Sequence, residues 1–187
     1  MPWLDEVRGR IAARPARRLA SPDAAARAAV LVPLYVADGR LWLILQRRSA
    51  GLPLHAGQFA FPGGMRDPAD ADEVATALRE AREELGIDPA RVLVLGRLDD
   101  ARTSTGYVVA PVVGAVPHPL ELTLRPEEVE EVVAVPVVEL LRPGAVEEQE
   151  VVIGTERVRS PVYRYRDHRI WGATARILAD LLGRLAG

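Results

Sequence analysis

Apolar and polar positions follow a strand-like pattern over residues 28–48, AAVLVPLYVADGRLWLILQRR. Two apolar runs rich in β-branched residues are joined there by Asp38 and Gly39. An Asp-Gly pair between two such runs is the strongest short-range signal of a β-hairpin. We therefore expect a hairpin whose second strand ends at Arg47 and Arg48.

Helical spacing of apolar residues predicts helices at both ends of the chain and one near its middle. The N-terminal residues are amphipathic up to Pro15, which ends or kinks a helix, so we expect residues 1–25 to form a helical cap. An apolar stripe near the other end predicts a closing helix over residues 165–187. The middle helix should begin near Asp72 and end at Gly86.

Further strands are predicted between these helices. The alternation at Phe59 and Phe61 indicates a short strand that places both rings in the core. Because strands and helices alternate without internal repeats or a long linker, we expect residues 1–187 to form one α/β domain with a central mixed sheet covered by helices on both faces. The remaining strands are expected over residues 91–100, 107–117 and, with short helical turns after it, 127–141.

Composition narrows the function classes. The 187-residue chain has a formal net charge of −2 and a pI of about 6.0, which offers no basic surface for nucleic acid or an anionic membrane. No stretch reaches the ~18 apolar residues needed to cross a bilayer, and we expect a cytoplasmic protein. There is no cysteine, so any metal ion must be held by oxygen or imidazole ligands. All 24 basic residues are arginine, which recognises phosphate with two hydrogen bonds.

Three glutamates gather on the middle helix. At about 100° per residue, Glu80, Glu83 and Glu84 occupy one arc beside the apolar face. Like charges at this spacing destabilise an isolated helix, so something outside the helix must favour them. Either Arg79 pairs with Glu83 on a solvated face, or the oxygens hold a hard divalent cation such as Mg²⁺. Gly63, just upstream, would let the backbone approach a ligand and aim a carbonyl at the metal.

Residues 63–87, GGMRDPADADEVATALREAREELGI, resemble the Nudix box. The first half is one residue longer than the box, and the early glutamate of the box has approximate stand-ins in Asp70, Asp72 and Glu73. The second half matches at every position: Arg79, Glu80, Ala81, Glu83, Glu84, Gly86 and Ile87.

The segment upstream, residues 45–64, is similar to the signature of coenzyme A pyrophosphatases. Gln46 stands where that family usually has Thr, and Pro53 stands where it usually has Arg. Other segments that resemble the family extend the likeness over about residues 28–182; they are 103–116, 127–141 and 163–178. The matching upstream positions are Arg48, Ser49, His55, Gly57, Gln58 and 61–64.

The resemblance implies a Nudix fold, which is an α/β/α sandwich, and a small-molecule substrate. The implied reaction is hydrolysis of the pyrophosphate bond of coenzyme A or its derivatives to 3′,5′-ADP and 4′-phosphopantetheine. Mg²⁺ or Mn²⁺ would be held by Glu80, Glu83, Glu84 and the carbonyl of Gly63. Arg79 would belong to the catalytic residues by orienting one of these glutamates.

The resemblance leaves the general base open. Glu128 or Glu131, in the stretch RPEEVEEVV, could take that role, and so could a glutamate of the box; a solvated acidic turn is the competing interpretation of that stretch. Contacts to the substrate are expected from four residues of the upstream signature. They are Arg48, Ser49, His55 and Gln58.

Two other functions compete with this interpretation. A Nudix enzyme acting on another nucleoside diphosphate derivative, such as ADP-ribose, would share the box. A catalytically idle nucleotide-binding sensor would have no chemical reason to retain the acidic set of the box. Trp171, in the closing segment, is expected to pack in the core.

Overall fold

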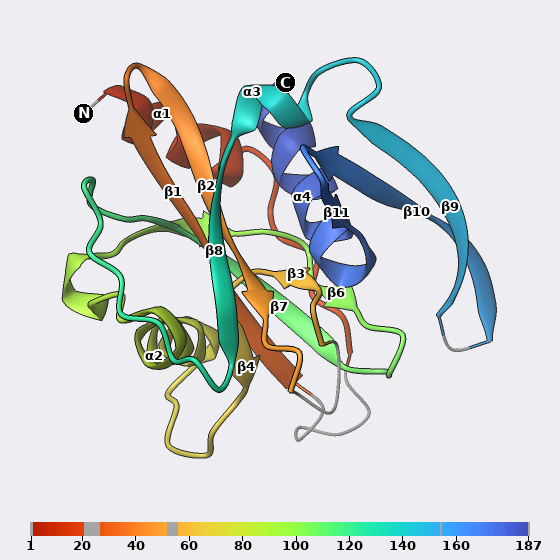
Figure 1. Cartoon of the computed structure of the whole chain (residues 1–187), viewed down its shortest axis with the longest axis horizontal. Coiled ribbons are helices and arrows are strands. Elements are labelled where there is room, and N and C mark those ends of the chain that lie inside the picture. The colour runs from red at the N-terminus through yellow and green to blue at the C-terminus, as the bar shows by residue number, and fades with distance from the viewer. Residues whose placement is uncertain (1, 21–26, 52–55, 154, 187) are drawn as a thin grey trace.

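The computed structural model describes residues 2–20, 27–51, 56–153 and 155–186 (Figure 1). Pro53 and the expected substrate contact His55 lie outside these ranges. The helices are α1 (Pro2–Ala12), α2 (Glu73–Leu85), the short 3₁₀ helix η2 (Pro89–Arg91), α3 (Val137–Leu140) and α4 (Gly172–Ala186). The strands are β1 (Arg27–Ala37), β2 (Arg40–Arg48), β3 (Phe59–Ala60), β4 (Gly63–Met65), β5 (Leu93–Arg97), β6 (Ala101–Arg102), β7 (Val108–Ala115), β8 (Val129–Pro136), β9 (Val146–Ile153), β10 (Glu156–Tyr165) and β11 (His168–Ile170).

The predicted hairpin is confirmed. Strands β1 and β2 pair antiparallel with Ala37 opposite Arg40, so only Asp38 and Gly39 form the turn. Both turn residues have positive φ angles, 50° and 69°. This conformation matches the twist of the strands, and Asp and Gly are the residues that adopt it at least cost.

A mixed sheet forms the centre of the molecule. Its path runs β3-β2-β1-β7-β5, with β4 paired to β1, β6 to β7 and β8 to β2. Strands β1 and β7 are parallel, and the other pairs are antiparallel. Because β4 pairs with β1, its two glycines, Gly63 and Gly64, are fixed to the middle of the sheet ahead of α2.

Helices cover both faces of this sheet, as predicted (Figure 1). The alternation along β1 shows the two layers: Ala29 and Leu31 pack with the apolar face of α2, whereas Val32 and Leu34 pack with α1 and α4. Such a period-two pattern buries both faces of a strand. The chain therefore has the α/β/α sandwich that the Nudix fold requires.

The two ends of the chain differ from the predicted helices. Helix α1 stops at Ala12, and the extended chain beyond it is tied to the loop after β5, where Arg17 and Leu19 donate backbone hydrogen bonds of 3.0 Å to Asp99 and Asp100. Helix α4 begins at Gly172, so the expectation of a helix from residue 165 was wrong at its start.

Residues 146–170 form a second sheet that was not predicted. It is antiparallel in the order β11-β10-β9, and its long hairpin extends away from the main sheet (Figure 1). Tyr163 and Tyr165 are buried while Arg164 between them is exposed, which is the period of a strand and not of a helix. None of the helices in the described residues is long and apolar enough to cross a membrane.

Candidate active site

The glutamates project from a helix with well-defined ends. Asp72 caps its N-terminus by accepting a 2.9 Å hydrogen bond from the backbone N–H of Ala75. Gly86 ends the helix in the left-handed conformation, with φ of 72°, as expected. The face that carries Ala77 and Ala81 is fully buried against the sheet, so the glutamates of the adjacent arc lie at its edge.

Glu84 is the most deeply buried acid of the box, at 1% exposed. Its Oε2 accepts hydrogen bonds from Nε2 of Gln46, at 2.7 Å, and from the backbone N–H of Gly63, at 2.8 Å. The pKa of Glu84 is raised to about 7, chiefly because the carboxyl group is buried and also because of the charge of Glu80; the two hydrogen bonds and the charge of Arg48 oppose this rise. The carboxylate is thus held in place by two other strands.

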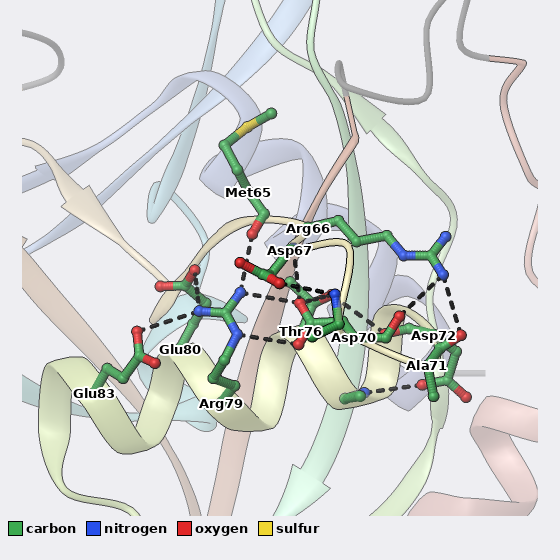
Figure 2. Close-up of polar contacts among 12 residues, drawn as sticks. Met65, Arg66, Asp67, Asp70, Ala71, Asp72, Thr76, Arg79, Glu80 and Glu83 are labelled. Atoms are coloured by element: carbon green, nitrogen blue, oxygen red, sulfur yellow. Dashed lines mark hydrogen bonds and ion pairs between the residues drawn. The ribbon is translucent and has the colours of Figure 1, made fainter.

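Arg79 gathers the remaining acids of the segment (Figure 2). Its Nε and Nη2 bind the two oxygens of Asp70 at 3.1 and 3.0 Å. Its Nη1 donates to Glu80 at 2.9 Å and to Glu83 at 3.2 Å, and Nη2 also donates to the carbonyl of Met65 at 3.1 Å. A single planar guanidinium therefore fixes the turn and orients two glutamates, a role for which arginine is better shaped than lysine.

The three acids in the first half of the box have different roles. Asp70 is the partner of Arg79, and it also accepts 2.9 Å hydrogen bonds from the backbone of Asp67 and the hydroxyl of Thr76. Asp72 is the helix cap. Glu73 pairs with two arginines of the sheet. When the box is counted forward from Gly64, Asp70 stands at the position of its early glutamate, and from there it supports the loop. The one extra residue of the first half lies between Asp70 and the helix.

Both glycines of β4 make close contacts that a Cβ would disturb. A Cβ on Gly63 would lie 2.3 Å from the carbonyl oxygen of Ala29 in β1. A Cβ on Gly64 would lie 2.6 Å from Oε1 of Glu80. The first glycine therefore lets β4 approach the sheet, and the second makes room for a carboxylate of the box.

The oxygen atoms of the candidate metal ligands suit a hard divalent cation. They are oxygen atoms only, and burial raises the pKa of Glu80 as well as that of Glu84, so nearby positive charge would stabilise both ionised forms. In the part of the chain that the structure describes, no three acids or histidines already converge on one point, and Arg79 occupies Glu80 and Glu83. The metal site therefore stays a prediction, for which the ligand chemistry is suitable.

A cavity of about 360 Å³ opens beside β4. Its wall includes Arg48, Gln58 and β4 itself. Arg48 presents a buried Nε that has no hydrogen-bond partner among the described residues. Ser49 does not line the cavity; its backbone N–H donates to the carbonyl of Glu128 at 2.9 Å, and its hydroxyl accepts from the backbone N–H of the nearby Gly51 at 3.4 Å.

The opposite wall of this cavity is apolar and includes Trp171. The expectation that Trp171 packs in the core was wrong, because its side chain is 37% exposed and faces the cavity, with the guanidinium of Arg169 5.8 Å from the ring centre. It sits where β11 ends and Gly172, with φ of 69°, turns the chain into α4. Phe59 and Phe61 are buried in the core, as expected, and also border the cavity.

The two candidates for the general base occupy different surroundings. Glu128 lies in the turn before β8, where its charge acts on Glu80 and its Oε1 pairs with Arg125 at 2.9 Å. Glu131 lies within β8, opposite Arg47 of β2, and pairs with it at 3.7 Å. Only Glu128 of these two is close enough to the box to influence the pKa of one of its glutamates.

Sequence reasoning missed the partner of Glu84. Gln46 is fully buried in β2, and it was noted only as a departure from the family pattern. The available signal was a single amide directly after the apolar run of this strand, since buried amides need a partner. One oxygen, Oε1 of Gln46, has no partner among the described residues, so the pair is not fully satisfied.

Comparison with known proteins agrees with this geometry. The NUDIX domain family matches residues 25–153. The chain is 43% identical to the uncharacterized Nudix hydrolase NudL of Photorhabdus laumondii over 167 residues, which cover 89% of this chain and 88% of the relative. It is 39% identical to NudL of Escherichia coli K12 over 155 residues, which cover 83% and 80%.

Two solved structures share the fold at low sequence identity. A MutT/nudix family protein from Enterococcus faecalis superposes with a TM-score of 0.60 at 17% identity, over 90% of this chain and 64% of the other. An Ap4A hydrolase from C. elegans gives 0.53 at 22% identity, over 61% and 83%. With the family match and the NudL relatives, these findings establish that the chain belongs to the Nudix family and is a pyrophosphohydrolase.

Proposed function

We propose that this Nudix enzyme hydrolyses the pyrophosphate bond of coenzyme A and its derivatives, releasing 3′,5′-ADP and 4′-phosphopantetheine. The observation that carries the proposal is the composition of the cavity. Arg48 and Gln58 come from the segment that resembles coenzyme A pyrophosphatases, and Trp171 and Thr174 come from the closing segment of the same resemblance. Because these distant segments line one cavity, a single ligand bound there can touch both.

The proposed metal ligands are Glu80, Glu83, Glu84 and the carbonyl of Gly63, and the ion is Mg²⁺ or Mn²⁺. Such ions, when bound, neutralise charge on the pyrophosphate oxygens and make a water molecule more acidic. The residues of this chain supply the rest. Gln46 and the N–H of Gly63 hold Glu84 in position, and the guanidinium of Arg79 keeps Glu80 oriented.

We assign the general base to Glu128 in preference to Glu131. Although Glu128 pairs with Arg125, it lies in a turn near enough to the box for its charge to act on Glu80, whereas Glu131 lies within β8 and faces Arg47 of β2. Arg48 contacts the pyrophosphate in this proposal, because it lines the cavity beside the box and a guanidinium binds phosphate oxygens well. The lack of cysteine suits a reducing cytoplasm, where we propose that the reaction takes place.

The substrate is tested by incubating the protein with coenzyme A, ADP-ribose and diadenosine polyphosphates in parallel, with Mg²⁺ or Mn²⁺, and identifying the products by mass spectrometry. We expect 3′,5′-ADP and 4′-phosphopantetheine to form fastest. Faster turnover of ADP-ribose than of coenzyme A would contradict the substrate assignment.

The metal site is tested with Glu84→Gln, which keeps the shape of the side chain and removes its charge. We expect kcat to fall by about tenfold to a hundredfold or more and Mg²⁺ affinity, measured by calorimetry, to weaken. The matched control is Glu150→Gln, at an exposed position on β9 that forms no ion pair with the described residues, which should change neither quantity. Full activity in Glu84→Gln would exclude the assignment.

A further inference from the structure

A second cavity adjoins the candidate active site. It has a volume of about 780 Å³ and lies between the chain after α1, the loop after β5, the β9-β10 hairpin and α4. Ile153 and Arg176 line both cavities, so the two spaces meet at these side chains. A ligand that fills the first cavity can therefore reach the second past Arg176.

The acids of the second cavity are almost all neutralised by arginines. Asp99 and Asp180 both pair with Arg14 and Arg184. Asp100 is bound by Arg27 at 3.1 Å and by Arg97 at 2.8 Å. These carboxylates are therefore not available to other cations lining the cavity.

Three arginines that line this cavity, Arg17, Arg102 and Arg176, form no ion pair with a carboxylate of the described residues. The charge of Arg17 acts on Asp99. Arg102 donates one long hydrogen bond, 3.4 Å, to the carbonyl of Ala20. The remaining acid, Glu156, is exposed at the start of β10. Among the described residues, the wall near Arg176 thus carries excess positive charge.

Arg176 lies where the two cavities meet, and its hydrogen bonds leave its charge without a partner among the described residues. Its Nη1 donates to the hydroxyl of Ser160 at 3.1 Å and its Nη2 to the carbonyl of Arg102, so both acceptors are uncharged. The acid at helical spacing from it, Asp180, is engaged by two arginines through Oδ1 and by the backbone N–H of Asp99 through Oδ2, at 2.8 Å. Arg176 therefore cannot be neutralised from its own helix.

Burial makes this arrangement costly for the chain alone. The pKa of Arg176 is lowered by desolvation, which means that its surroundings disfavour the charged form. A guanidinium has five N–H donors, and two are used here. An anion in the cavity would use the remaining donors and offset the desolvation, and phosphate fits the planar donor array best.

We propose that Arg176 and Arg102 form a phosphate subsite that binds a second phosphate of the substrate, distinct from the pyrophosphate cleaved at the box. This inference rests on the proposed function and makes it more specific. In coenzyme A, the phosphate outside the pyrophosphate is the 3′-phosphate of the adenosine. Arg176 is thus a specificity residue that selects nucleotides with a 3′-phosphate.

The test compares coenzyme A with 3′-dephospho-coenzyme A, which differ only in that phosphate. In Arg176→Gln we expect the ratio of kcat/KM for coenzyme A to kcat/KM for 3′-dephospho-coenzyme A to fall by about tenfold to a hundredfold, the range for a lost charge-assisted hydrogen bond. Arg102→Gln, which removes no contact to Ser160, should lower the ratio in the same direction. An unchanged ratio in both variants would overturn the subsite.

The matched control is Arg157→Gln, which removes one charge from an exposed position of the same hairpin and does not line either cavity. Its ratio should equal that of the unmodified protein; an equal fall in the control would attribute the effect to general charge instead. If Arg176→Gln only disturbed the folded structure, kcat/KM would fall by the same factor for both substrates. The ratio would then be unchanged, and this result would count against the subsite.

A binding measurement separates this inference from the proposed function. If neither form of coenzyme A is hydrolysed, the proposed substrate is wrong, and calorimetry with 3′,5′-ADP and 5′-AMP then tests the subsite alone. Tighter binding of 3′,5′-ADP that is lost in Arg176→Gln supports the subsite. Equal binding of the two nucleotides overturns it.

Discussion

Gln46 in β2 donates a 2.7 Å hydrogen bond to Glu84 in α2, and thereby fixes a carboxylate that is almost completely buried. Replacing Gln46 with Leu would leave that carboxylate without a side-chain donor. We expect the free energy of unfolding to fall by about 1–3 kcal/mol, measured by urea denaturation, because a buried charged group loses a partner. In the Glu84→Gln background the same replacement should cost less, and an equal cost in both backgrounds would show that the pair is not coupled.

Arg79 holds its acids through the shape of its guanidinium. Lys at this position keeps the charge but cannot bind both oxygens of Asp70 and reach Glu80 at once. We expect Arg79→Lys to lower kcat by about tenfold to a hundredfold through misplaced glutamates. Arg82→Lys, on the exposed side of the same helix, is the control and should retain normal kcat. Normal kcat in Arg79→Lys would show that charge alone suffices.

Asp70 should make stability depend on pH in the acidic range. Its guanidinium partner lowers its pKa from the ordinary value of 3.8 to about 2. Because the folded-state pKa is lowered, the stabilisation is complete above pH 3.8 and is lost as the pH falls through about 2. Asp70→Asn should therefore be less stable than the unmodified protein by about 1–2 kcal/mol at neutral pH, and the difference should shrink between pH 4 and pH 2. A pH-independent difference would contradict this assignment.

Gly63 and Gly64, the two glycines of β4, should respond differently to replacement by alanine. In Gly63→Ala the new Cβ meets backbone of β1, which cannot move aside, and we expect failure to fold. In Gly64→Ala the Cβ meets the flexible end of Glu80, so the protein should fold with reduced kcat. Circular dichroism and kcat distinguish these outcomes. Gly9→Ala, where nothing lies within 4 Å of the added atom, is the control and should fold with normal kcat.

The assignment of the general base predicts unequal effects at two nearby acids. Glu128→Gln should lower kcat by about a hundredfold or more with little change in KM, as expected for the loss of general-base catalysis. Glu131→Gln should lower kcat by less than about twofold, because only an exposed pair with Arg47 is lost. The reverse order would move the role to Glu131, and small effects in both would move it to a glutamate of the box.

Local signals predicted most of the fold. The hairpin at Asp38 and Gly39, the cap at Asp72 and the stop at Gly86 each depend on residues that are adjacent in sequence and on backbone angles that few residue types adopt. The second sheet was not predicted: no element was assigned to residues 146–164, and the predicted C-terminal helix covered Tyr165, which alternates with exposed neighbours, and β11.

The site was predicted less completely, because its contacts join distant segments. Spacing on the helix grouped Glu80 and Glu84 correctly, but the burial of Glu84 depends on Gln46, a residue of another strand. The exposure of Trp171 depends on how α4 meets β11, which its own sequence does not reveal. Likewise, that Arg176 has no acidic partner among the described residues becomes visible only when the partners of Asp180 are known.

The parallel pairing of β1 with β7 has a consequence for how the enzyme folds. Residue Arg27 lies opposite Val108, so this central pair closes a loop of chain that contains the whole of β4 and α2. Closing a long loop costs entropy before any contact repays it, and such pairings form slowly. Helix α2 alone can bring its glutamates side by side, but the contacts of Glu84 to Gln46 and Gly63 require that α2 is packed on the sheet.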